Sequence, residues 1–255
     1  MKNKIKLKKF LLTITLFSII MLKEAAENSN KEKLQLKNSL SDISHQLKTP
    51  LTSILIILDN LIDDPDMEKV VREDFIRNIK METTNISFFV QAILKLSKLD
   101  TNTVDFIEEK TYIKDIVDEV VKNLSILCDL RNIKIITTYK ENAQITCDFR
   151  WQVEAFSNLI KNCIEHSKDN SNILLEVDEN NVYSQVVIRD NGTGIDKEDL
   201  PHIFERFYKG KNSSCESCGI GLSLAKAIIE KSNGNIYVES KIGKRSTFTI
   251  KYFRM

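Results

Sequence analysis

Apolar residues recur every seven positions in the segment after residue 37, and this repeat strongly limits how the segment can fold. The repeated positions are Leu40, Leu47, Ile54 and Leu61. Such a repeat predicts a helix that packs one apolar stripe against other helices. If Leu40 takes position a of the heptad, His45 takes position f, on the solvent side. A histidine exchanges its proton near neutral pH, so an exposed one is available for chemistry.

A second helix is predicted to follow the first. The first helix should cover residues 24–62 and the second about 67–99, separated by Asp63-Asp64-Pro65-Asp66. Proline disfavours the helical conformation in the residue before it, which explains the break. The second stripe consists of Ile76, Ile79, Ile86, Val90 and Ile93. One hairpin cannot bury both stripes, so we expect two copies to form a four-helix bundle, although a plain coiled coil would also explain the stripes.

From Thr103 onward the apolar pattern changes. Short alternating runs predict strands near residues 133–139, 144–147, 172–178, 182–190, 235–240 and 246–252. Helical patterns occupy about 112–130, 150–167 and 222–232. This mixed order predicts an α/β sandwich with helices on one face of a sheet. The fold class expected for the chain is therefore α+β, a helical hairpin followed by an α/β sandwich domain.

Charge and cysteine content narrow the possible functions. The formal net charge is +1 over 255 residues, which gives no sign of a nucleic-acid partner. Cys128, Cys147 and Cys163 lie in apolar contexts and are expected in the core. Cys215 and Cys218 form a single CxxC, and a structural zinc site usually needs four ligands. We expect incidental thiols there, with a redox-sensitive lid as the alternative.

Polar residues of the second half fall on particular faces of the predicted elements. Asn158, Asn162 and His166 are spaced i, i+4 and i+8, so they share one helix face, opposite an apolar one. Asp190 ends a predicted strand and has the same parity as Ile188, so its carboxylate should point inward. A buried carboxylate needs a hydrogen-bond donor.

Five motifs occur in a recognisable order. They are the histidine segment 41–54, the asparagine segment 156–167, Arg-Asp-Asn-Gly-Thr-Gly-Ile-Asp at 189–196, Phe-Glu-Arg-Phe-Tyr-Lys at 204–209, and Ser-Cys-Gly-Ile-Gly-Leu-Ser-Leu-Ala-Lys at 217–226. All seven glycines lie between Gly192 and Gly243. This ordered set resembles the two-component sensor histidine kinases, over about residues 38 to 255. Five motifs in the order of that family are very improbable by chance.

The resemblance implies an ATP-binding domain of the gyrase, Hsp90 and histidine kinase type. Asn162 would be the Mg²⁺ ligand, with Asn158 lining the same pocket wall, on the helix face that His166 shares. Asp190 would accept a hydrogen bond from the exocyclic amine of adenine. Gly192 and Gly194 would let the backbone turn tightly and approach the ring.

The resemblance also implies groups for the phosphates. Arg206 and Lys209 offer positive charge, while Phe204 and Phe207 would anchor a lid. The glycines Gly219 and Gly221 precede a helix starting near Leu222, where free backbone amides can bind phosphate. Ser217 stands where relatives often have a third glycine, which leaves the phosphate contacts of that loop open.

The activity that the resemblance implies is phosphoryl transfer. A ring nitrogen of His45 would attack the γ-phosphate of ATP, and the phosphohistidine would then supply an aspartate of a separate response regulator. Gln46 stands where many relatives have a carboxylate, and Thr49 matches the position linked to dephosphorylation of the regulator. Two alternatives stay open: a phosphatase-biased regulator, and a non-catalytic dimeric protein that binds ATP.

The N-terminal segment is expected to attach the protein to a membrane. Lysines at 2, 4, 6, 8 and 9 precede an apolar run from Phe10 to Leu22, shorter than the roughly 20 residues of a spanning helix. A short anchor, an interfacial segment and a signal peptide are the three interpretations, and export would separate a kinase from cytosolic ATP. We expect a membrane segment over 1–23, a dimerisation and phosphotransfer hairpin over 24–101 and a catalytic domain over 102–255, located at the cell membrane with the catalytic parts in the cytoplasm.

Overall fold

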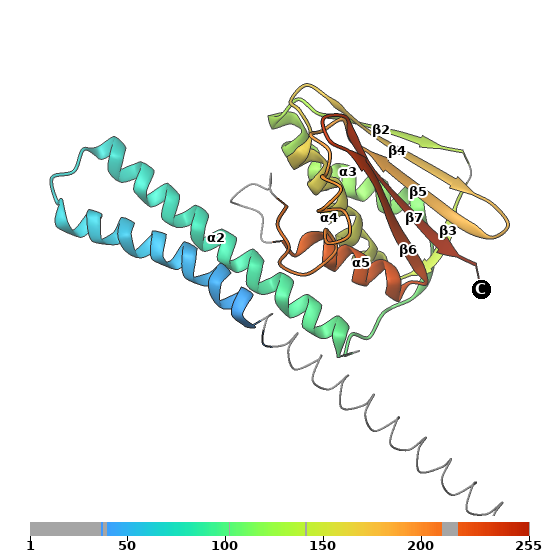
Figure 1. Cartoon of the computed structure of the whole chain (residues 1–255), viewed down its shortest axis with the longest axis horizontal. Helices are drawn as coiled ribbons and strands as arrows, with labels where there is room; N and C mark the ends of the chain where they lie inside the picture. The colour runs from blue at the N-terminus through green and yellow to red at the C-terminus, as the bar shows by residue number, and fades with distance from the viewer. Residues whose placement is uncertain (1–36, 38–39, 102, 141, 211–218, 255) are drawn as a thin grey trace, which may run out of the picture. The chain divides into compact units, whose positions relative to one another are not determined.

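The computed structural model describes residues 37, 40–101, 103–140, 142–210 and 219–254 (Figure 1). The predicted membrane segment 1–23, the predicted helix up to residue 36, and Cys215, Ser217 and Cys218 lie outside the described residues. The chain divides after Leu55 into two compact units, Met1–Leu55 and Ile56–Met255.

A continuous helix covers residues 40–63 and carries the heptad repeat. It ends where the sequence predicts, since residue 64 is no longer helical and Pro65 and Asp66 form a turn. The amide of Asp64 still donates to the carbonyl of Asn60 over 3.2 Å, so the helix closes its last turn before the proline. The predicted break is confirmed.

The next helix, α2 (Lys69–Asp100), has two apolar sides. None of the predicted stripe is fully buried in the single chain: Ile76 and Val90 are exposed, at 55% and 39%, and the other three residues are half-buried. Phe89, Leu96 and Leu99, which lie off that stripe, are buried within the second unit, where α2 contacts α5. The stripe therefore describes one side of α2 and misses the side that the rest of the chain covers.

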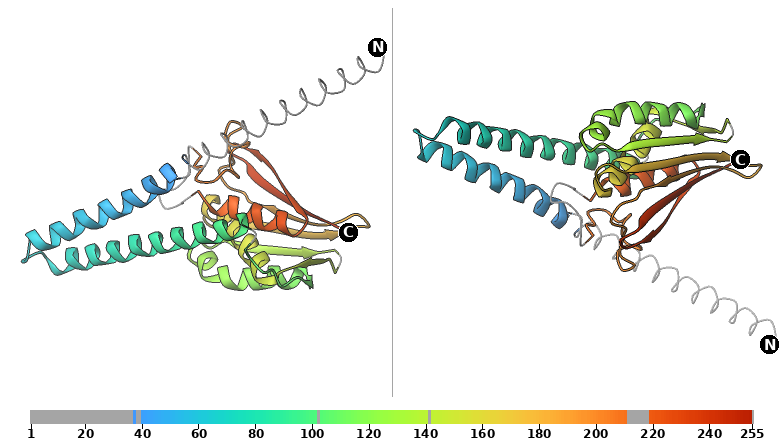
Figure 2. Two further views of the ribbon diagram at one scale, coloured as in Figure 1. Left: turned by 90° about the horizontal axis from the view of Figure 1, so that it is seen from below. Right: turned by 90° about the horizontal axis from the view of Figure 1, so that it is seen from above.

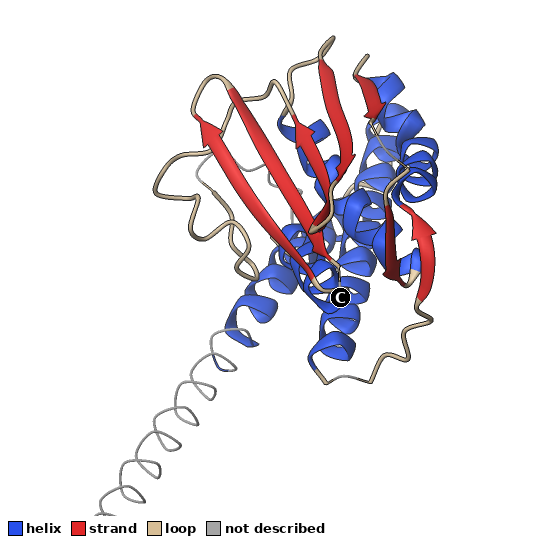
Figure 3. Cartoon of the chain, turned by 90° about the vertical axis from the view of Figure 1, so that its right-hand side faces the viewer, coloured by secondary structure: helices blue, strands red, loops and turns tan. Residues whose placement is uncertain are grey.

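The remaining elements form the α/β sandwich that the sequence predicts. The strands are β1 (Glu109–Tyr112), β2 (Lys134–Tyr139), β3 (Gln144–Cys147), β4 (Asn172–Glu179), β5 (Tyr183–Arg189), β6 (Gly234–Lys241) and β7 (Arg245–Phe253). The helices are α3 (Ile113–Leu130), α4 (Phe149–His166) and α5 (Gly221–Lys231). The main sheet has the order β2-β4-β5-β7-β6, with only β2 and β4 parallel. Figures 2 and 3 show the three helices together on one face of this sheet.

Strand β1 is the one element of this domain that the sequence pattern missed. It pairs antiparallel with β3 in a separate two-stranded sheet. Its four residues include only one buried side chain, Thr111, so no apolar alternation marks it. Pairing with a distant strand, rather than local periodicity, makes this segment extended.

The core lies between the main sheet and the helices. Alternate residues of β7 are buried, as are the residues of α4 that face the sheet, including Phe156, Leu159 and Ile160. Each buried side chain of this size contributes about 1.5–3 kcal/mol relative to an exposed one. This packing fixes the rotation of α4 about its axis, and therefore determines which of its residues face away from the core.

Helix α4 has a defined start as well as a packed side. Asp148 caps it, with Oδ1 accepting from the amides of Arg150 and Trp151 over 3.0 and 3.2 Å. The other oxygen, Oδ2, accepts from the amide of Ile107 over 3.1 Å. Phe106 lies against Trp151 with ring centroids 5.7 Å apart. The segment that leaves α2 is thereby attached to the first turn of α4.

Candidate functional site

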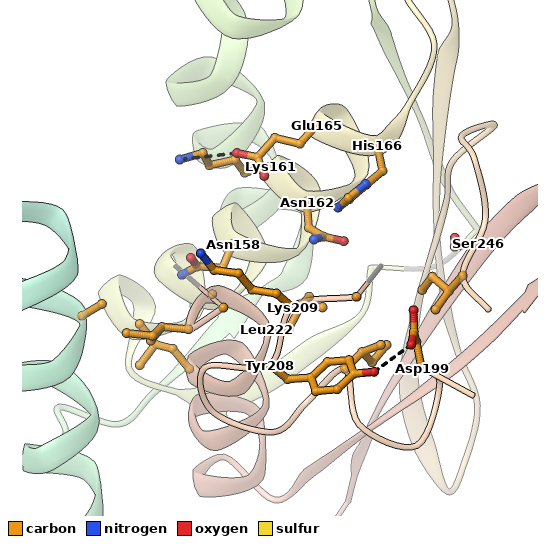
Figure 4. Close-up of a pocket in the computed structure, with 18 of the residues that line it drawn as sticks. Asn158, Lys161, Asn162, Glu165, His166, Asp199, Tyr208, Lys209, Leu222 and Ser246 are labelled. Carbon is orange, nitrogen blue, oxygen red and sulfur yellow. Dashed lines mark hydrogen bonds and ion pairs between the residues drawn. The ribbon is translucent and has the colours of Figure 1, made fainter. Parts of the chain in front are cut away.

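A cavity of about 410 Å³ opens beside α4 in the second unit (Figure 4). Its lining comes from α4, from the loop after β5, from the segment 203–210, from the start of α5 and from α2. The chain segments that carry the predicted motifs of the second half therefore meet around one space. These segments are separated along the sequence, so it is the fold that brings them together.

One wall of the cavity is the polar face of α4. Asn158, Asn162 and His166 all line the cavity, as their spacing predicts, and Figure 4 shows the three side chains along the same helix. The Nδ2 group of Asn158 donates to the carbonyl of Glu154 over 2.9 Å, which holds this amide against the helix. A Cβ atom at Gly221 would lie 3.0 Å from Asn158 Oδ1, so the start of α5 approaches this wall closely.

Asp190 also lines the cavity. Its side chain is 2% exposed, which confirms the inward orientation predicted from strand parity. Oδ1 accepts from the amides of Gly192 and Ser246 over 2.8 and 3.2 Å. Burial raises the pKa of Asp190, and these hydrogen bonds oppose the rise without cancelling it. The pKa of the Cys163 thiol is also raised well above its ordinary value. Burial is the main cause, and the nearby Asp190 carboxylate adds to it.

The glycine loop after β5 rests on the end of α4. A Cβ atom at Gly192 would lie 2.3 Å from the carbonyl oxygen of His166, and Thr193 donates its amide to the same oxygen over 3.2 Å. Gly194 has φ +71°, a conformation that favours glycine, and a Cβ there would lie 2.2 Å from the carbonyl oxygen of Lys241. Any side chain at either position would displace the loop from the cavity.

The start of α5 presents backbone amides to the cavity. The first amides of a helix have no partner within the helix and carry partial positive charge. Among the described residues no side chain caps α5, whereas Asp148 caps α4. Gly219, Gly221 and Leu222 line the cavity at this point. Anions bind at such helix ends.

The motif at residues 204–209 contributes two polar side chains to the cavity lining. Tyr208 donates its hydroxyl to Oδ1 of the buried Asp199 over 2.7 Å, as Figure 4 shows, and Lys209 lines the cavity. Arg206 is not among the lining residues. Its guanidinium binds the carboxylate of Asp100, the last residue of α2, over 2.7 and 2.6 Å.

Several lining residues were not anticipated from the sequence. Asp199 belongs to none of the motifs, and α2 adds Phe89 and Lys95. Lys95 pairs with Glu154 over 2.7 Å, and the ring of Phe89 lies 6.2 Å from that of Phe207. No local pattern could have found them, because each reaches the cavity through tertiary packing.

His45, Gln46 and Thr49 lie on the helix over 40–63, within the first unit. His45 is exposed, as expected for position f, and Gln46 is half-buried. The hydroxyl of Thr49 donates to the carbonyl of His45 over 3.3 Å, one helical turn away. This bond places a polar side chain on the same turn as the imidazole.

Across residues 37, 40–101, 103–140, 142–210 and 219–254, no three histidine, cysteine or acidic side chains gather closely enough to bind a metal ion. Within the same residues no helix has the length and apolar character needed to cross a membrane.

Comparisons with known proteins agree with this architecture. Residues 35–102 match the family of the His Kinase A (phospho-acceptor) domain. Residues 147–255 match the histidine kinase-, DNA gyrase B- and HSP90-like ATPases. The heme sensor protein HssS of Staphylococcus saprophyticus is 32% identical over 214 residues, which is 84% of this chain and 45% of that protein.

Two solved structures show the same fold. The histidine kinase AdeS of Acinetobacter baumannii has a TM-score of 0.66 and 24% identity, over 82% of this chain and 97% of AdeS. Histidine kinase ThkA, solved in complex with the response regulator protein TrrA, has a TM-score of 0.73 and 18% identity, over 91% of this chain and 66% of the other.

Together the phosphoacceptor and ATPase matches cover most of the chain, in the order that the motifs predict. The chain belongs to the sensor histidine kinases of two-component systems. It spans less than half the length of the curated relatives that it matches.

Proposed function

We propose that this chain is an ATP-dependent protein histidine kinase that phosphorylates His45 and passes the phosphoryl group to a response regulator. The observation that carries the proposal is the cavity of the second unit. It combines a buried carboxylate, Asp190, with the polar face of α4 and with the start of α5, which no side chain of the described residues caps. An adenine nucleotide needs an acceptor for its amine and donors for its phosphates, and this lining offers both.

The donor set also fits Mg²⁺ bound together with a nucleotide. Magnesium keeps several waters and takes few protein ligands when substrate phosphates supply the others. Asn162 would hold the ion through its side-chain amide oxygen, and Asn158 would line the same wall. Bound there, the ion would neutralise the charge of the phosphate oxygens.

Other residues of the cavity would bind the adenine ring and the phosphates. Asp190 would orient the adenine ring, and Gly192 and Gly194 would keep the loop close to it. Backbone amides at Gly219, Gly221 and Leu222 would bind phosphate oxygens, with charge from Lys209. Arg206 would join them only after leaving Asp100, and His166 would complete the α4 wall.

The transfer itself would occur at the imidazole of His45. A neutral ring nitrogen forms the new N–P bond, the bond from the γ-phosphorus to the bridging oxygen breaks, and ADP leaves with that electron pair. The other ring nitrogen keeps its proton and positive charge grows on the ring. Gln46 can accept a hydrogen bond from that N–H and orient the imidazole, but it cannot offer a carboxylate.

We further propose a homodimer, with a receiver domain of a response regulator as the second partner and with attachment to the cell membrane through residues 1–23. Large side chains exposed on the helices support the dimer, including Leu51 at 49% and Leu58 at 39%. A phosphatase-biased function remains the alternative, because the Thr49 hydroxyl lies one turn from His45.

The deciding experiment is incorporation of label from γ-labelled ATP into the purified chain. Acid-labile, base-stable label on the wild type supports a phosphohistidine. If the chain binds ATP but no label appears, the result would favour a non-catalytic or a phosphatase-biased function.

A further inference from the structure

The C-terminal end of α4 is bound by Ser167, its own C-cap residue, and by a side chain from the end of α3. The last four carbonyls of a helix have no partner within it and need donors from elsewhere. Here Ser167 binds the Cys163 carbonyl through its amide over 3.0 Å and also through its hydroxyl. The carbonyls of Ile164 and Glu165 are bound by the guanidinium of Arg131, the C-cap residue of α3.

Arg131 binds on both sides of His166. One of its terminal nitrogens contacts the carbonyls of Ile164 and of Glu165, the latter over 3.1 Å, and the other donates to the carbonyl of Ser167 over 2.7 Å. Its Nε pairs with Asp169 over 2.8 Å. The planar fork of arginine can bind several acceptors at once, which an ammonium group cannot do in the same geometry.

Arg131 does not bind the carbonyl of His166, which instead accepts a hydrogen bond from the glycine loop after β5. The His166 oxygen accepts the Thr193 amide over 3.2 Å, and a Cβ at Gly192 would lie 2.3 Å from it. Gly192 in turn donates its amide to Asp190. A shift in the last turn of α4 would therefore move the loop and the carboxylate together.

We propose that Arg131 is a positioning residue for the adenine end of the cavity. It fixes the final turn of α4, and with it the loop from Asp190 to Gly194 and the side chain of His166. It does not line the cavity and belongs to none of the five motifs. This inference rests on the proposed function, because it deepens the assignment of the nucleotide site.

The test measures ATP and ADP affinity by calorimetric titration of the whole chain, well below the melting temperature of the least stable variant. Arg131→Gln should raise both dissociation constants by about tenfold, which corresponds to about 1.4 kcal/mol, because the loop that carries Asp190 loses its fixed position. Arg131→Lys keeps the charge without the fork and should fall between wild type and Arg131→Gln. In the kinase assay KM for ATP should rise, while kcat at saturating ATP changes little.

Two control variants separate positioning from stability. Asp169→Asn removes the ion pair but keeps the donors to the carbonyls, and Lys140→Met removes a comparable pair with Asp178, 3.2 Å apart, far from α4 in the sequence. Both should bind ATP like the wild type, even if their melting temperatures fall.

The outcomes are distinguishable. Wild-type affinity in Arg131→Gln, or an equal loss in Lys140→Met, would overturn the role of Arg131. If Arg131→Gln does not fold, Arg131→Lys decides, and unchanged affinity there overturns the role as well. Failure of the wild type to bind ATP would instead reject the proposed function.

Discussion

Two helices carry the proposed chemistry, and the chain supports them in different ways. The side of α4 that faces the sheet is enclosed, with Phe156, Leu159 and Ile160 at 0% exposure. The helix over 40–63 leaves large apolar side chains open, including Leu51 at 49% and Leu55 at 59%. One helix is oriented by its own chain, while the other exposes the surface with which we expect it to meet another copy.

This difference teaches where each half of the reaction is specified. The rotation of α4, and hence the positions of Asn158 and Asn162, follows from burial within a single chain. The acceptor helix has its chemistry on an exposed face, and the described residues of this chain cover its apolar stripe only in part. Nucleotide binding should therefore be a property of the single chain, and phosphorylation a property of the assembly.

The strongest test of the separation is His45→Ala. It should abolish label incorporation while leaving ATP affinity and oligomeric state unchanged, because an exposed side chain contributes little to packing. Label transfer from γ-labelled ATP and calorimetric binding would be measured in parallel. His202→Ala is the matched control, since His202 is also exposed, and label persisting on His45→Ala would reject this residue as the acceptor.

Substitutions in the cavity beside α4 should weaken nucleotide binding. Asn162→Ala should weaken binding of magnesium-ATP and Asp190→Ala should weaken binding of adenosine, each by about tenfold to 10²-fold, the range expected when a buried polar partner is lost. Lys122→Ala, an exposed lysine of α3 that does not line the cavity, is the control. Unchanged affinity in both Asn162→Ala and Asp190→Ala would remove the proposed pocket.

Substitutions on the exposed apolar face of the helix over 40–63 should change the oligomeric state. Leu51→Glu combined with Leu55→Glu should convert a dimer into a monomer in light scattering, because charge would face the proposed partner helix. The control is Ile126→Glu with Leu130→Glu, two residues 74% and 79% exposed on α3. ATP affinity should be retained in both variants. Dimers that persist in the first variant would contradict the bundle.

The burial of Asp190 predicts how binding depends on pH. Because burial raises the pKa of this carboxyl, it should take up a proton at a higher pH than an ordinary aspartate. The protonated form cannot accept from the adenine amine through that oxygen, so ATP affinity should fall on mild acidification. The same raised pKa means that this residue's contribution to fold stability is present at low pH and lost as pH rises through the folded-state value.

The measurement is the ATP dissociation constant from neutral to mildly acidic pH, with Asp190→Asn as the control. The asparagine variant should bind weakly with little pH dependence. A wild-type curve as flat as that of the variant would show that Asp190 does not govern binding.

The smallest expected effect concerns Gln46. Gln46→Glu should speed phosphorylation of His45, because a carboxylate stabilises the charge that develops on the imidazole better than an amide does. We expect an increase of about threefold to tenfold, below the usual range of general-base catalysis, since in the proposed mechanism Gln46 already orients the ring. Initial rates at saturating ATP would decide. An equal or slower rate would show that the amide suits its surroundings.

Much of the fold could be predicted because its signals are local. Period-two and period-3.6 patterns report which side of an element is buried, and they located the strands β2 to β7 and the helices α3 to α5 to within a few residues. The same patterns placed Asp190 inside and Asn158, Asn162 and His166 on one face. The domain boundaries and the roles of individual site residues stay predictions.

Other features depended on contacts between distant parts of the chain. Strand β1 is extended because β3 pairs with it, and Arg206 lies on Asp100 rather than in the cavity lining. Neither relation leaves a periodic trace in the sequence, because each joins residues that are far apart along the chain.

The sequence by itself determined the motifs, their order and the face that each functional side chain occupies, since these follow from residue type and spacing. The tertiary structure alone decided which faces meet: that Arg131 closes the end of α4, that Asp199 and Ser246 reach the cavity, and that α2 buries Phe89 rather than its predicted stripe. The reason is physical. Periodicity records whether a side chain is covered, but what covers it depends on how the whole chain folds back on itself.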